Sequence, residues 1–185
     1  MSNGVPDPGR RQLLTWLWRL PVVAAVAGAG YALFEGRRVL LGKLPAVQAP
    51  RFAAREPVTV APIGEFAQPW DAVTFELAGQ PALALRLPEA VAGGLSVGSV
   101  HLAAFSRTCT HQGCTVSLNR DIEAIAFAFN YRTDTPELVC PCHLSVFSPS
   151  DGGRAVSGPA VQPLPRVELE LEAEDVLAVG IEEAV

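Results

Sequence analysis

Four cysteines and two of the three histidines in this 185-residue chain fall between positions 109 and 143. They form two short motifs: CTHQGC, which begins at Cys109, and CPCHLSVF, which begins at Cys140. Thiolates and imidazoles at such short spacings are ligands for metal ions, and clustered cysteines also pair as disulfides. The sequence therefore indicates a metal site, a disulfide or both in this part of the chain.

The arrangement of the ligand types favours an iron–sulfur cluster over a zinc ion. Each motif offers one Cys–His pair, Cys109 with His111 and Cys140 with His143. A mixed-ligand cluster places two thiolates on one iron and two imidazoles on the other, so two such loops would hold one cluster from both sides. Structural zinc is the alternative, but zinc sites usually pair their cysteines two to four residues apart within one loop. A scaffold of disulfides alone would leave both histidines unexplained.

Together the two motifs resemble the cluster loops of the Rieske iron–sulfur protein family. The segment at 158–165, which contains Gly158-Pro159-Ala160 and Pro163-Leu164-Pro165, resembles the proline-rich loop that covers the cluster in this family. The resemblance is strong over 106–165. It implies one [2Fe–2S] cluster, with Cys109 and Cys140 on the inner iron and His111 and His143 on the outer iron.

The same resemblance assigns roles to residues beside the ligands. Cys114 and Cys142 would form a disulfide, which is typical of the quinol-oxidising branch. Ser145 matches a serine that donates a hydrogen bond to a cluster sulfur. Phe147 stands where many high-potential relatives have a tyrosine that hydrogen-bonds a ligand thiolate, so we expect a lower potential here. His101 lies outside both motifs, and we expect it to be structural.

Two residues beside the ligand histidines depart from the family pattern. Gln112 replaces the usual leucine and Leu144 replaces the usual glycine of quinol–cytochrome complexes. The small subunits of arsenite oxidases also have a bulky residue at the position of Leu144. The segment Thr115–Val139 between the motifs is longer than usual. These changes keep the cluster ligands but alter the surface that a partner would touch.

The charge of the chain changes sharply near position 50. Residues 1–50 carry six basic and two acidic side chains, whereas residues 51–185 carry eight basic and seventeen acidic ones. The acidic body, within a net charge of −5, argues against nucleic-acid binding. A basic leader before an acidic body indicates a targeting or membrane segment.

The leader contains a hydrophobic stretch from Leu13 to Phe34, and a bilayer span needs roughly 20 residues. Arg10-Arg11 before it resembles a twin-arginine export signal. We expect a disordered segment at 1–12, an uncleaved transmembrane signal anchor at 13–41 and a flexible linker at 42–57. A disulfide requires an oxidising compartment. The expected location is the bacterial inner membrane, with the globular domain on the periplasmic side.

After the linker the pattern becomes that of β-strands. Alternating apolar residues predict strands at Asp71–Leu77, Ala82–Leu87, Val97–Phe105 and Ala124–Phe129, and a hairpin of Val167–Leu171 with Val176–Ile181. Many short strands with Gly/Pro turns predict an all-β fold. We expect a Rieske-type antiparallel sandwich at 58–185 with a small cluster-binding subdomain at 106–165, preceded by the transmembrane helix.

The resemblance implies an electron carrier rather than a complete enzyme. The leading hypothesis is the Rieske subunit of a cytochrome bc-type complex, which accepts electrons from quinol and passes them to a c-type cytochrome. His143 would then be the catalytic residue that takes a proton from quinol, and a cytochrome b-type subunit would complete the hetero-oligomer. The alternative is a small relay subunit of an arsenite oxidase-type molybdenum enzyme. A terminal oxygenase needs a second iron site of two histidines and a carboxylate, and only His101 remains.

Overall fold

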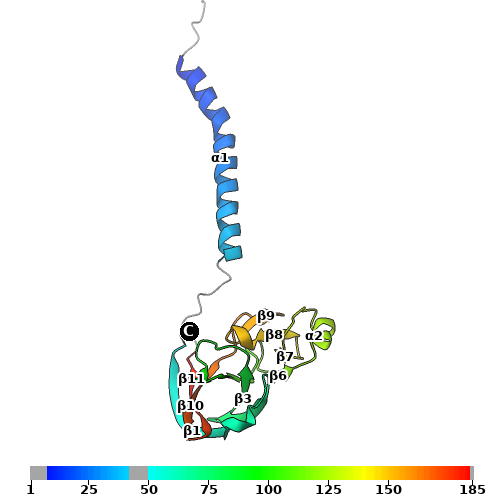
Figure 1. The fold of residues 1–185 in the computed structure, drawn as a ribbon. Coiled ribbons are helices and arrows are strands. Elements are labelled where there is room, and N and C mark those ends of the chain that lie inside the picture. The colour runs from blue at the N-terminus through cyan, green and yellow to red at the C-terminus, as the bar shows by residue number, and fades with distance from the viewer. Residues whose placement is uncertain (1–7, 42–49, 184–185) are drawn as a thin grey trace, which may run out of the picture. The chain divides into compact units, whose positions relative to one another are not determined.

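The computed structural model describes residues 8–41 and 50–183 and divides the chain into two units, Met1–Ala46 and Val47–Val185 (Figure 1). The first unit is helix α1, Pro8–Leu41. The helix begins earlier than expected, so residues 8–12 are helical rather than disordered, and residues 1–7 lie outside the described residues. No helix in the described part of the chain combines the length and apolarity needed to cross a membrane, so the expected span at 13–41 is not shown.

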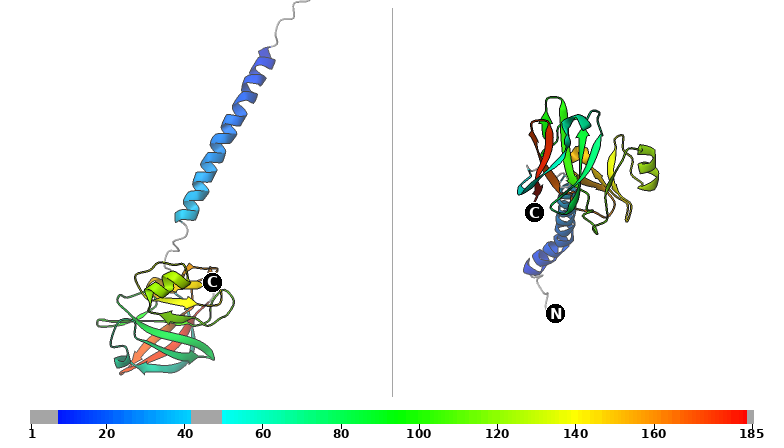
Figure 2. Two further views of the ribbon diagram at one scale, coloured as in Figure 1. Left: turned by 90° about the vertical axis from the view of Figure 1, so that its right-hand side faces the viewer. Right: turned by 90° about the horizontal axis from the view of Figure 1, so that it is seen from below.

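The second unit is built from two antiparallel sheets (Figures 1 and 2). The larger sheet has the order β1-β11-β10-β5-β3-β2, with β4 paired to β5. Its strands are β1 (Phe52–Pro62), β2 (Ala72–Leu77), β3 (Gln80–Leu87), β4 (Leu95–Val97), β5 (Val100–Ser106), β10 (Arg166–Glu172) and β11 (Asp175–Glu182). This unit is predominantly β, as expected, with few helical segments.

The smaller sheet has the order β6-β7-β8-β9. Its strands are β6 (Ser117–Asn119), β7 (Glu137–Cys140), β8 (Ser145–Ser148) and β9 (Arg154–Ser157). Helix α2 (Ile122–Ala128) lies between β6 and β7, and short 3-10 turns occur at η1 (Ile63–Glu65) and η2 (Pro149–Asp151). This sheet carries both ends of the second motif, because β7 ends at Cys140 and β8 begins at Ser145.

Strand β3 contributes side chains to two hydrophobic cores, one on each face of the larger sheet, because successive side chains of a strand point to opposite faces. Ala82 and Ala84 face a core enclosed by the curled larger sheet, together with Phe66, Leu102 and Val176. Leu83, Leu85 and Leu87 face a second core, which the smaller sheet completes with Leu138, Phe147, Cys109 and Cys140. The two motif cysteines are therefore part of the apolar contact between the sheets.

The other face of the smaller sheet is covered by α2. Val139 and Val146 pack with Ile125 in a third, smaller core, against which Phe129 and Tyr131 are partly buried. Each strand of this sheet thus presents one face to the larger sheet and one to α2. The four strands have only three or four residues each. An isolated sheet of this size would leave much of its apolar surface in water, so both of its faces must be covered.

The strand expected at Ala124–Phe129 is wrong, because this segment belongs to α2. Asp121 caps the helix by accepting hydrogen bonds from the backbone N–H groups of Glu123 and Ala124. The helix buries Ile125 and partly buries Phe129, which are four positions apart, and leaves Phe127 94% exposed. The strand-like alternation in the sequence therefore came from Ile125, Phe127 and Phe129, of which only Ile125 and Phe129 are on the buried side.

Two other boundaries also differ from expectation. The strand expected at Val97–Phe105 is two strands, β4 and β5, because Gly98 turns the chain with a φ of +58°. Strand β1 begins at Phe52, so the expected linker does not extend to residue 57, and residues 42–49 lie outside the described residues. The expected strands near β2 and β3 and the β10–β11 hairpin are confirmed.

Candidate metal centre

The first motif forms a loop between β5 and β6 that its own backbone closes. The Cys109 N–H donates to the Cys114 carbonyl, and the Gly113 N–H donates to the Cys109 carbonyl, each at 2.8 Å. Gly113 has a φ of +77°, which glycine adopts at little cost. A Thr108–Thr115 bridge joins the two sides of the loop at its base. This closure fixes the positions of Cys109 and His111 relative to each other.

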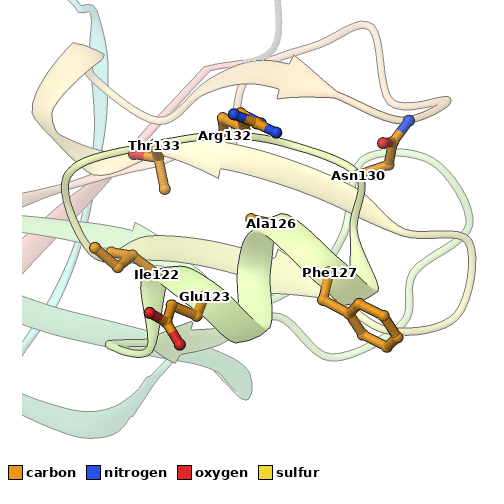
Figure 3. A pocket seen from close by; sticks show the side chains of 7 residues that line it. All are labelled: Ile122, Glu123, Ala126, Phe127, Asn130, Arg132 and Thr133. Carbon is orange, nitrogen blue, oxygen red and sulfur yellow. The ribbon is translucent and has the colours of Figure 1, made fainter.

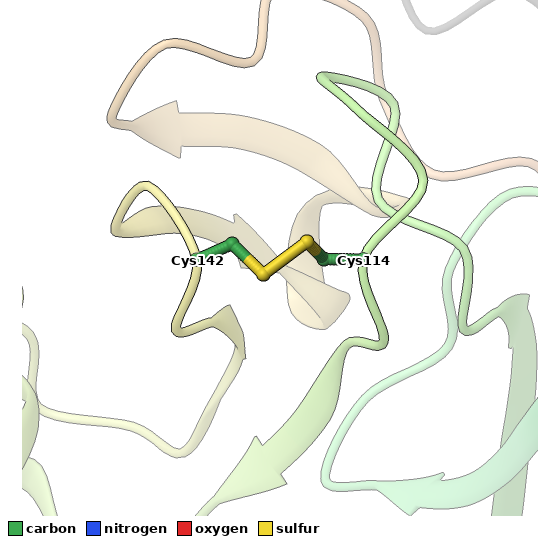
Figure 4. The surroundings of a disulfide bond; sticks show 2 residues. All are labelled: Cys114 and Cys142. Atoms are coloured by element: carbon green, nitrogen blue, oxygen red, sulfur yellow. A yellow bond between two sulfur atoms is a disulfide. The ribbon is translucent and has the colours of Figure 1, made fainter.

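The second motif is the hairpin turn between β7 and β8, in which Cys140 pairs with Ser145 across the strands. Leu144 closes the turn with a φ of +60°, in the left-handed region that favours glycine. Cys114 and Cys142 form a disulfide with a Cα–Cα distance of 6.5 Å, within the usual range (Figure 4). The disulfide implied by the resemblance is thus present, and it ties the two loops together.

A third loop covers the second motif. Gly158 has a φ of +82°, and a Cβ there would lie 2.5 Å from the Leu144 carbonyl oxygen, so only glycine fits. The Ala160 N–H donates to the buried Ser145 Oγ at 3.2 Å. The Thr110 hydroxyl donates to the Gln162 carbonyl at 2.8 Å, which links the first motif to the same loop. The proline-rich segment therefore holds both motifs in place.

The four residues expected as ligands differ in exposure in a systematic way. Cys109 is 3% and Cys140 is 1% exposed, and neither is in a disulfide. His111 is half-buried and His143 is exposed. The two imidazole rings lie with their centroids 4.8 Å apart, nearly perpendicular at 88°. The structure thus brings the thiols together in the core and the imidazoles together towards the surface.

Comparison with known proteins identifies this arrangement. The family profile of the Rieske [2Fe-2S] domain matches residues 56–168, well over half of the chain. The chain belongs to the Rieske family. The Rieske cofactor is a [2Fe–2S] cluster, which is the cofactor expected from the sequence.

Three Rieske relatives illustrate the extent of the similarity. The cytochrome bc1 complex Rieske iron-sulfur subunit of Streptomyces lividans is 36% identical over 76 residues, which is 41% of this chain but only 38% of that protein. The iodate reductase subunit IdrB of Denitromonas iodatirespirans is 26% identical over 178 residues, 94% of this chain and 80% of that protein. The soluble domain of Rieske protein II (soxF) from Sulfolobus acidocaldarius has the same fold, with a TM-score of 0.54 and 24% identity over 71% of this chain and 82% of that one.

The residues at the Rieske site fit a [2Fe–2S] cluster. Nδ1 of His111 is buried and has no hydrogen-bond partner among the described residues, as a nitrogen reserved for a metal would be. Burial raises the pKa of the Cys140 thiol, and neighbouring Cys109 raises it further, whereas backbone N–H groups of Cys142 and His143 lower it. Two adjacent buried thiols become thiolates only beside a positive charge such as iron.

The disulfide limits which sulfurs can bind a metal. The sulfurs of Cys114, Cys140 and Cys142 lie within 4.8 Å of one another. Two of these three are bonded to each other, so only Cys140 keeps a sulfur that can ionise. The disulfide therefore braces the loops beside the cluster site and contributes no ligand.

The structure gives the surroundings of three further residues to which the sequence assigned roles, Ser145, Phe147 and His101. Ser145 is fully buried, and its oxygen accepts from Ala160, so its hydroxyl proton is free to point at a cluster sulfur. Phe147 is fully buried in the core that contains both ligand cysteines, and it offers no hydroxyl. His101 pairs with Ser96 between β4 and β5, with 2.9 Å between Nδ1 and Oγ, which agrees with a structural role.

Glu137, on the same strand as Cys140, was missed by the sequence reasoning. It is 2% exposed, and its Oε2 has no hydrogen-bond partner among the described residues. The only signal in the sequence is a single charge at the start of an apolar run, ELVC, that enters the second motif. An isolated glutamate at a strand end is ordinarily exposed, so this signal was too weak to use.

Proposed function

We propose that this chain is the membrane-anchored electron-transfer subunit of a hetero-oligomeric cytochrome bc-type complex, which takes electrons from quinol and passes them to a c-type cytochrome. The observation that carries the proposal is the graded exposure of the ligands, with buried Cys109 and Cys140 and an exposed His143. When bound, the [2Fe–2S] cluster supplies one-electron chemistry at a potential raised by its imidazole ligands. The chain is a carrier and not a complete enzyme.

The chain's own residues determine how a substrate reaches this site. The exposed imidazole edge of His143 can accept a hydrogen bond from a quinol hydroxyl and take its proton. His111 is half-buried beside it, so it is less available to a partner. The disulfide and the covering loop keep these rings at a fixed position, which short electron-transfer distances require.

Two exposed apolar side chains lie on the loop that carries His143 and on the loop that covers it, where a partner subunit could dock. Leu144 is 46% exposed and Val161 is 86% exposed, on the two loops that meet at this end of the domain. Leu144 keeps a left-handed backbone conformation that glycine would adopt more cheaply, by about 1 kcal/mol. A large, exposed apolar side chain in a backbone conformation that favours glycine is costly, so its presence at position 144 favours a role in contacting a partner protein.

The anchor and the location belong to the same proposal. Among the side chains of α1 that the structure describes, the large apolar and aromatic ones are exposed, which supports burial of the helix in a bilayer: Trp16, Leu20, Val22, Val23, Val26, Tyr31 and Leu33. The Cys114–Cys142 disulfide supports an oxidising compartment. We therefore place the domain on the periplasmic side of a bacterial inner membrane, with the twin arginines at positions 10 and 11 as the export signal.

A second candidate is the relay subunit of an arsenite oxidase-type molybdenum enzyme. The observation that favours it is the end-to-end similarity to an iodate reductase subunit, over 94% of this chain. The similarity to the bc1 subunit, in contrast, is confined to 41% of this chain. A relay would use the same ligands and the same exposed surface, with a catalytic subunit in place of cytochrome b.

The docking surface can be tested with a double variant, Leu144→Ser with Val161→Ser, in the full chain reassembled with its native complex. Loss of two partly buried contacts of an interface should raise the KM for the partner about tenfold. Phe127→Ser is the control, because Phe127 is also an exposed apolar side chain, at 94%, but belongs to α2 and to neither loop. Equal effects of the two changes would contradict docking at His143.

The identity of the partner is decided by the purified complex itself. A cytochrome bc-type complex should contain haem b and reduce a c-type cytochrome with quinol. An arsenite oxidase-type complex should contain molybdenum and show no quinol-dependent reduction. The purification should start from membranes in which cytochrome bc-type and molybdenum-containing complexes remain intact. If the chain then purifies without any redox partner, both candidates are contradicted.

A further inference from the structure

Strand β7 carries one ionisable side chain that the metal centre does not use. Glu137 lies three residues before Cys140 and is 2% exposed. Because side chains alternate along a strand, Glu137 shares the face of Val139, which α2 covers, while Cys140 faces the cluster. At about 3.3 Å per residue the two Cα atoms are roughly 10 Å apart. The carboxyl is thus close to the centre without touching its ligands.

The surroundings of the Glu137 carboxyl accommodate a proton better than a charge. Oε1 accepts a hydrogen bond from the Thr133 hydroxyl at 2.9 Å, whereas Oε2 is buried with no partner among the described residues. Burial raises the pKa of Glu137 to about 7, although the hydroxyls of Thr133 and Ser148 lower it, and the Asp134 carboxylate raises it again. A buried, half-satisfied carboxylate is destabilised, and binding a proton removes the charge.

The charged groups around Glu137 do not neutralise it. The ion pairs of the described residues are Arg154 with Asp151 and Arg166 with Glu182, so neither arginine pairs with this carboxyl. The Tyr131 phenol packs nearby, and its pKa is raised by burial and then by Glu137. On the neighbouring strand, Glu137 is opposite the uncharged Asn119. No ion pair of the described residues therefore offsets a negative charge on Glu137.

Thr133 connects this buried carboxyl to solvent. Thr133 lines an open surface pocket with Ile122, Glu123, Ala126, Phe127, Asn130 and Arg132 (Figure 3). Its hydroxyl bonds Glu137 and has a second acceptor in the Thr135 carbonyl at 3.1 Å. The hydroxyl can donate to an ionised Glu137, or accept from a protonated one while donating to Thr135. Oε1 can therefore keep its bond to Thr133, a residue that lines the pocket, in both protonation states.

We propose that Glu137 is a redox-linked proton site: it binds one proton from solvent, through Thr133 and the pocket, when the centre gains one electron, and releases it on reoxidation. The electron comes from the reductant that the electron-transfer role supplies, and the only bond made is the carboxyl O–H. An added negative charge on the opposite face of the same strand disfavours the carboxylate, which couples the two events. The proposal rests on the electron-transfer role but not on which partner is correct.

The test is the midpoint potential of the full, cluster-loaded chain between about pH 5 and pH 9, compared with Glu137→Gln. We expect reduction to raise the proton affinity of Glu137 about tenfold. For a one-electron couple, the midpoint potential at acid pH should then be about 59 mV higher than the midpoint potential at alkaline pH. Glu137→Gln should lose this step near neutral pH and keep any step at higher pH that belongs to the ligand histidines. Glu123→Gln, an exposed carboxyl of the same pocket, is the matched control and should keep the neutral step.

A second measurement does not depend on the folding of a variant. Redox-induced infrared difference spectra of the wild-type chain near neutral pH should show a protonated carboxyl band on reduction.

Thr133→Val should move the neutral step of the midpoint potential to higher pH, because the Thr133 hydroxyl favours the ionised carboxylate. A centre that titrates normally but shows neither the step nor the band would overturn the role of Glu137 alone. A chain with no redox-active centre would instead overturn the electron-transfer role.

Discussion

The two faces of the smaller sheet differ in how they are built. One face carries Leu138, Cys140 and Phe147 into the apolar core shared with the larger sheet, next to a disulfide and a covering loop. The other face carries Val139 and the carboxyl of Glu137, under a seven-residue helix. The cluster face is apolar and cross-linked, whereas the α2 face contains a group that titrates near neutral pH.

This difference suggests a division of roles within one sheet. Fixed ligand geometry requires a rigid, dry environment, and the cluster face provides it through covalent and backbone contacts. Proton exchange at Glu137 requires a path to water, and on the α2 face this carboxyl bonds Thr133, a residue that lines the pocket. The two properties can coexist because a strand separates them by the alternation of its side chains.

The largest expected effect tests the cross-link of the cluster face. Replacing Cys114 and Cys142 by serine opens a loop with a sequence separation of 28. The lost restriction of the unfolded chain predicts a destabilisation of about 3–4 kcal/mol. Hydrogen exchange should show the loss in β7 and β8, with smaller changes in the larger sheet. Uniform weakening of both sheets would mean that the disulfide does not act on this face specifically.

A slightly smaller effect tests the α2 face through the dependence of stability on pH. The pKa of Glu137 is raised to about 7 in the folded chain, above the value of 4.5 that it has when exposed. The native state therefore binds this proton more tightly than the unfolded state does. Its contribution is full below about pH 4.5 and is lost as pH rises through 7, a change of roughly 3 kcal/mol.

Urea unfolding of the wild type and of Glu137→Gln at acid and alkaline pH measures this contribution directly. The variant carries no ionisable group at this position, so it should gain stability relative to the wild type as pH rises. Glu123→Gln is again the control, because that carboxyl is exposed on α2, the helix that covers this face of the smaller sheet. Parallel pH profiles for wild type and Glu137→Gln would show that the carboxyl is not held protonated.

The smallest effect returns to the cluster face. Phe147→Tyr would place a hydroxyl in the core that contains both ligand cysteines. A hydrogen bond to a thiolate stabilises the more negative, reduced state, so the midpoint potential should rise by on the order of 40 mV for about 1 kcal/mol. A redox titration followed by electron paramagnetic resonance measures it. No rise, in a variant with unchanged cluster content, would contradict the assignment of Phe147 as a missing donor.

The cluster face was largely predictable from the sequence, because its determinants are local motifs. The two loops, the paired cysteines and the proline-rich segment are each recognisable within ten residues, and their joining in space follows from a shared metal. The hairpin of β10 and β11 was equally clear, because apolar residues alternate on both sides of Glu172–Asp175. The register shift between Glu168 and Leu169 was not expected from the pattern.

The α2 face was not predictable in the same way. Ala124–Phe129 alternates like a strand, and only the cap at Asp121 and the packing of Ile125 against Val139 decide for a helix. Glu137 is buried because that helix and the following loop cover it, which no local pattern around position 137 encodes. Tertiary contacts made by the segment between the motifs therefore determine what this face does.

The assignment of four mixed ligands to one cluster is the centre of this account, and pulsed electron paramagnetic resonance of the reduced, full-length chain tests it most directly. With ¹⁵N-labelled histidine, the spectrum should show two strongly coupled nitrogens, and replacing His143 by cysteine should remove one of them. A spectrum without strongly coupled nitrogen, or a protein that binds zinc and no iron under conditions that assemble iron–sulfur clusters, would contradict the assignment.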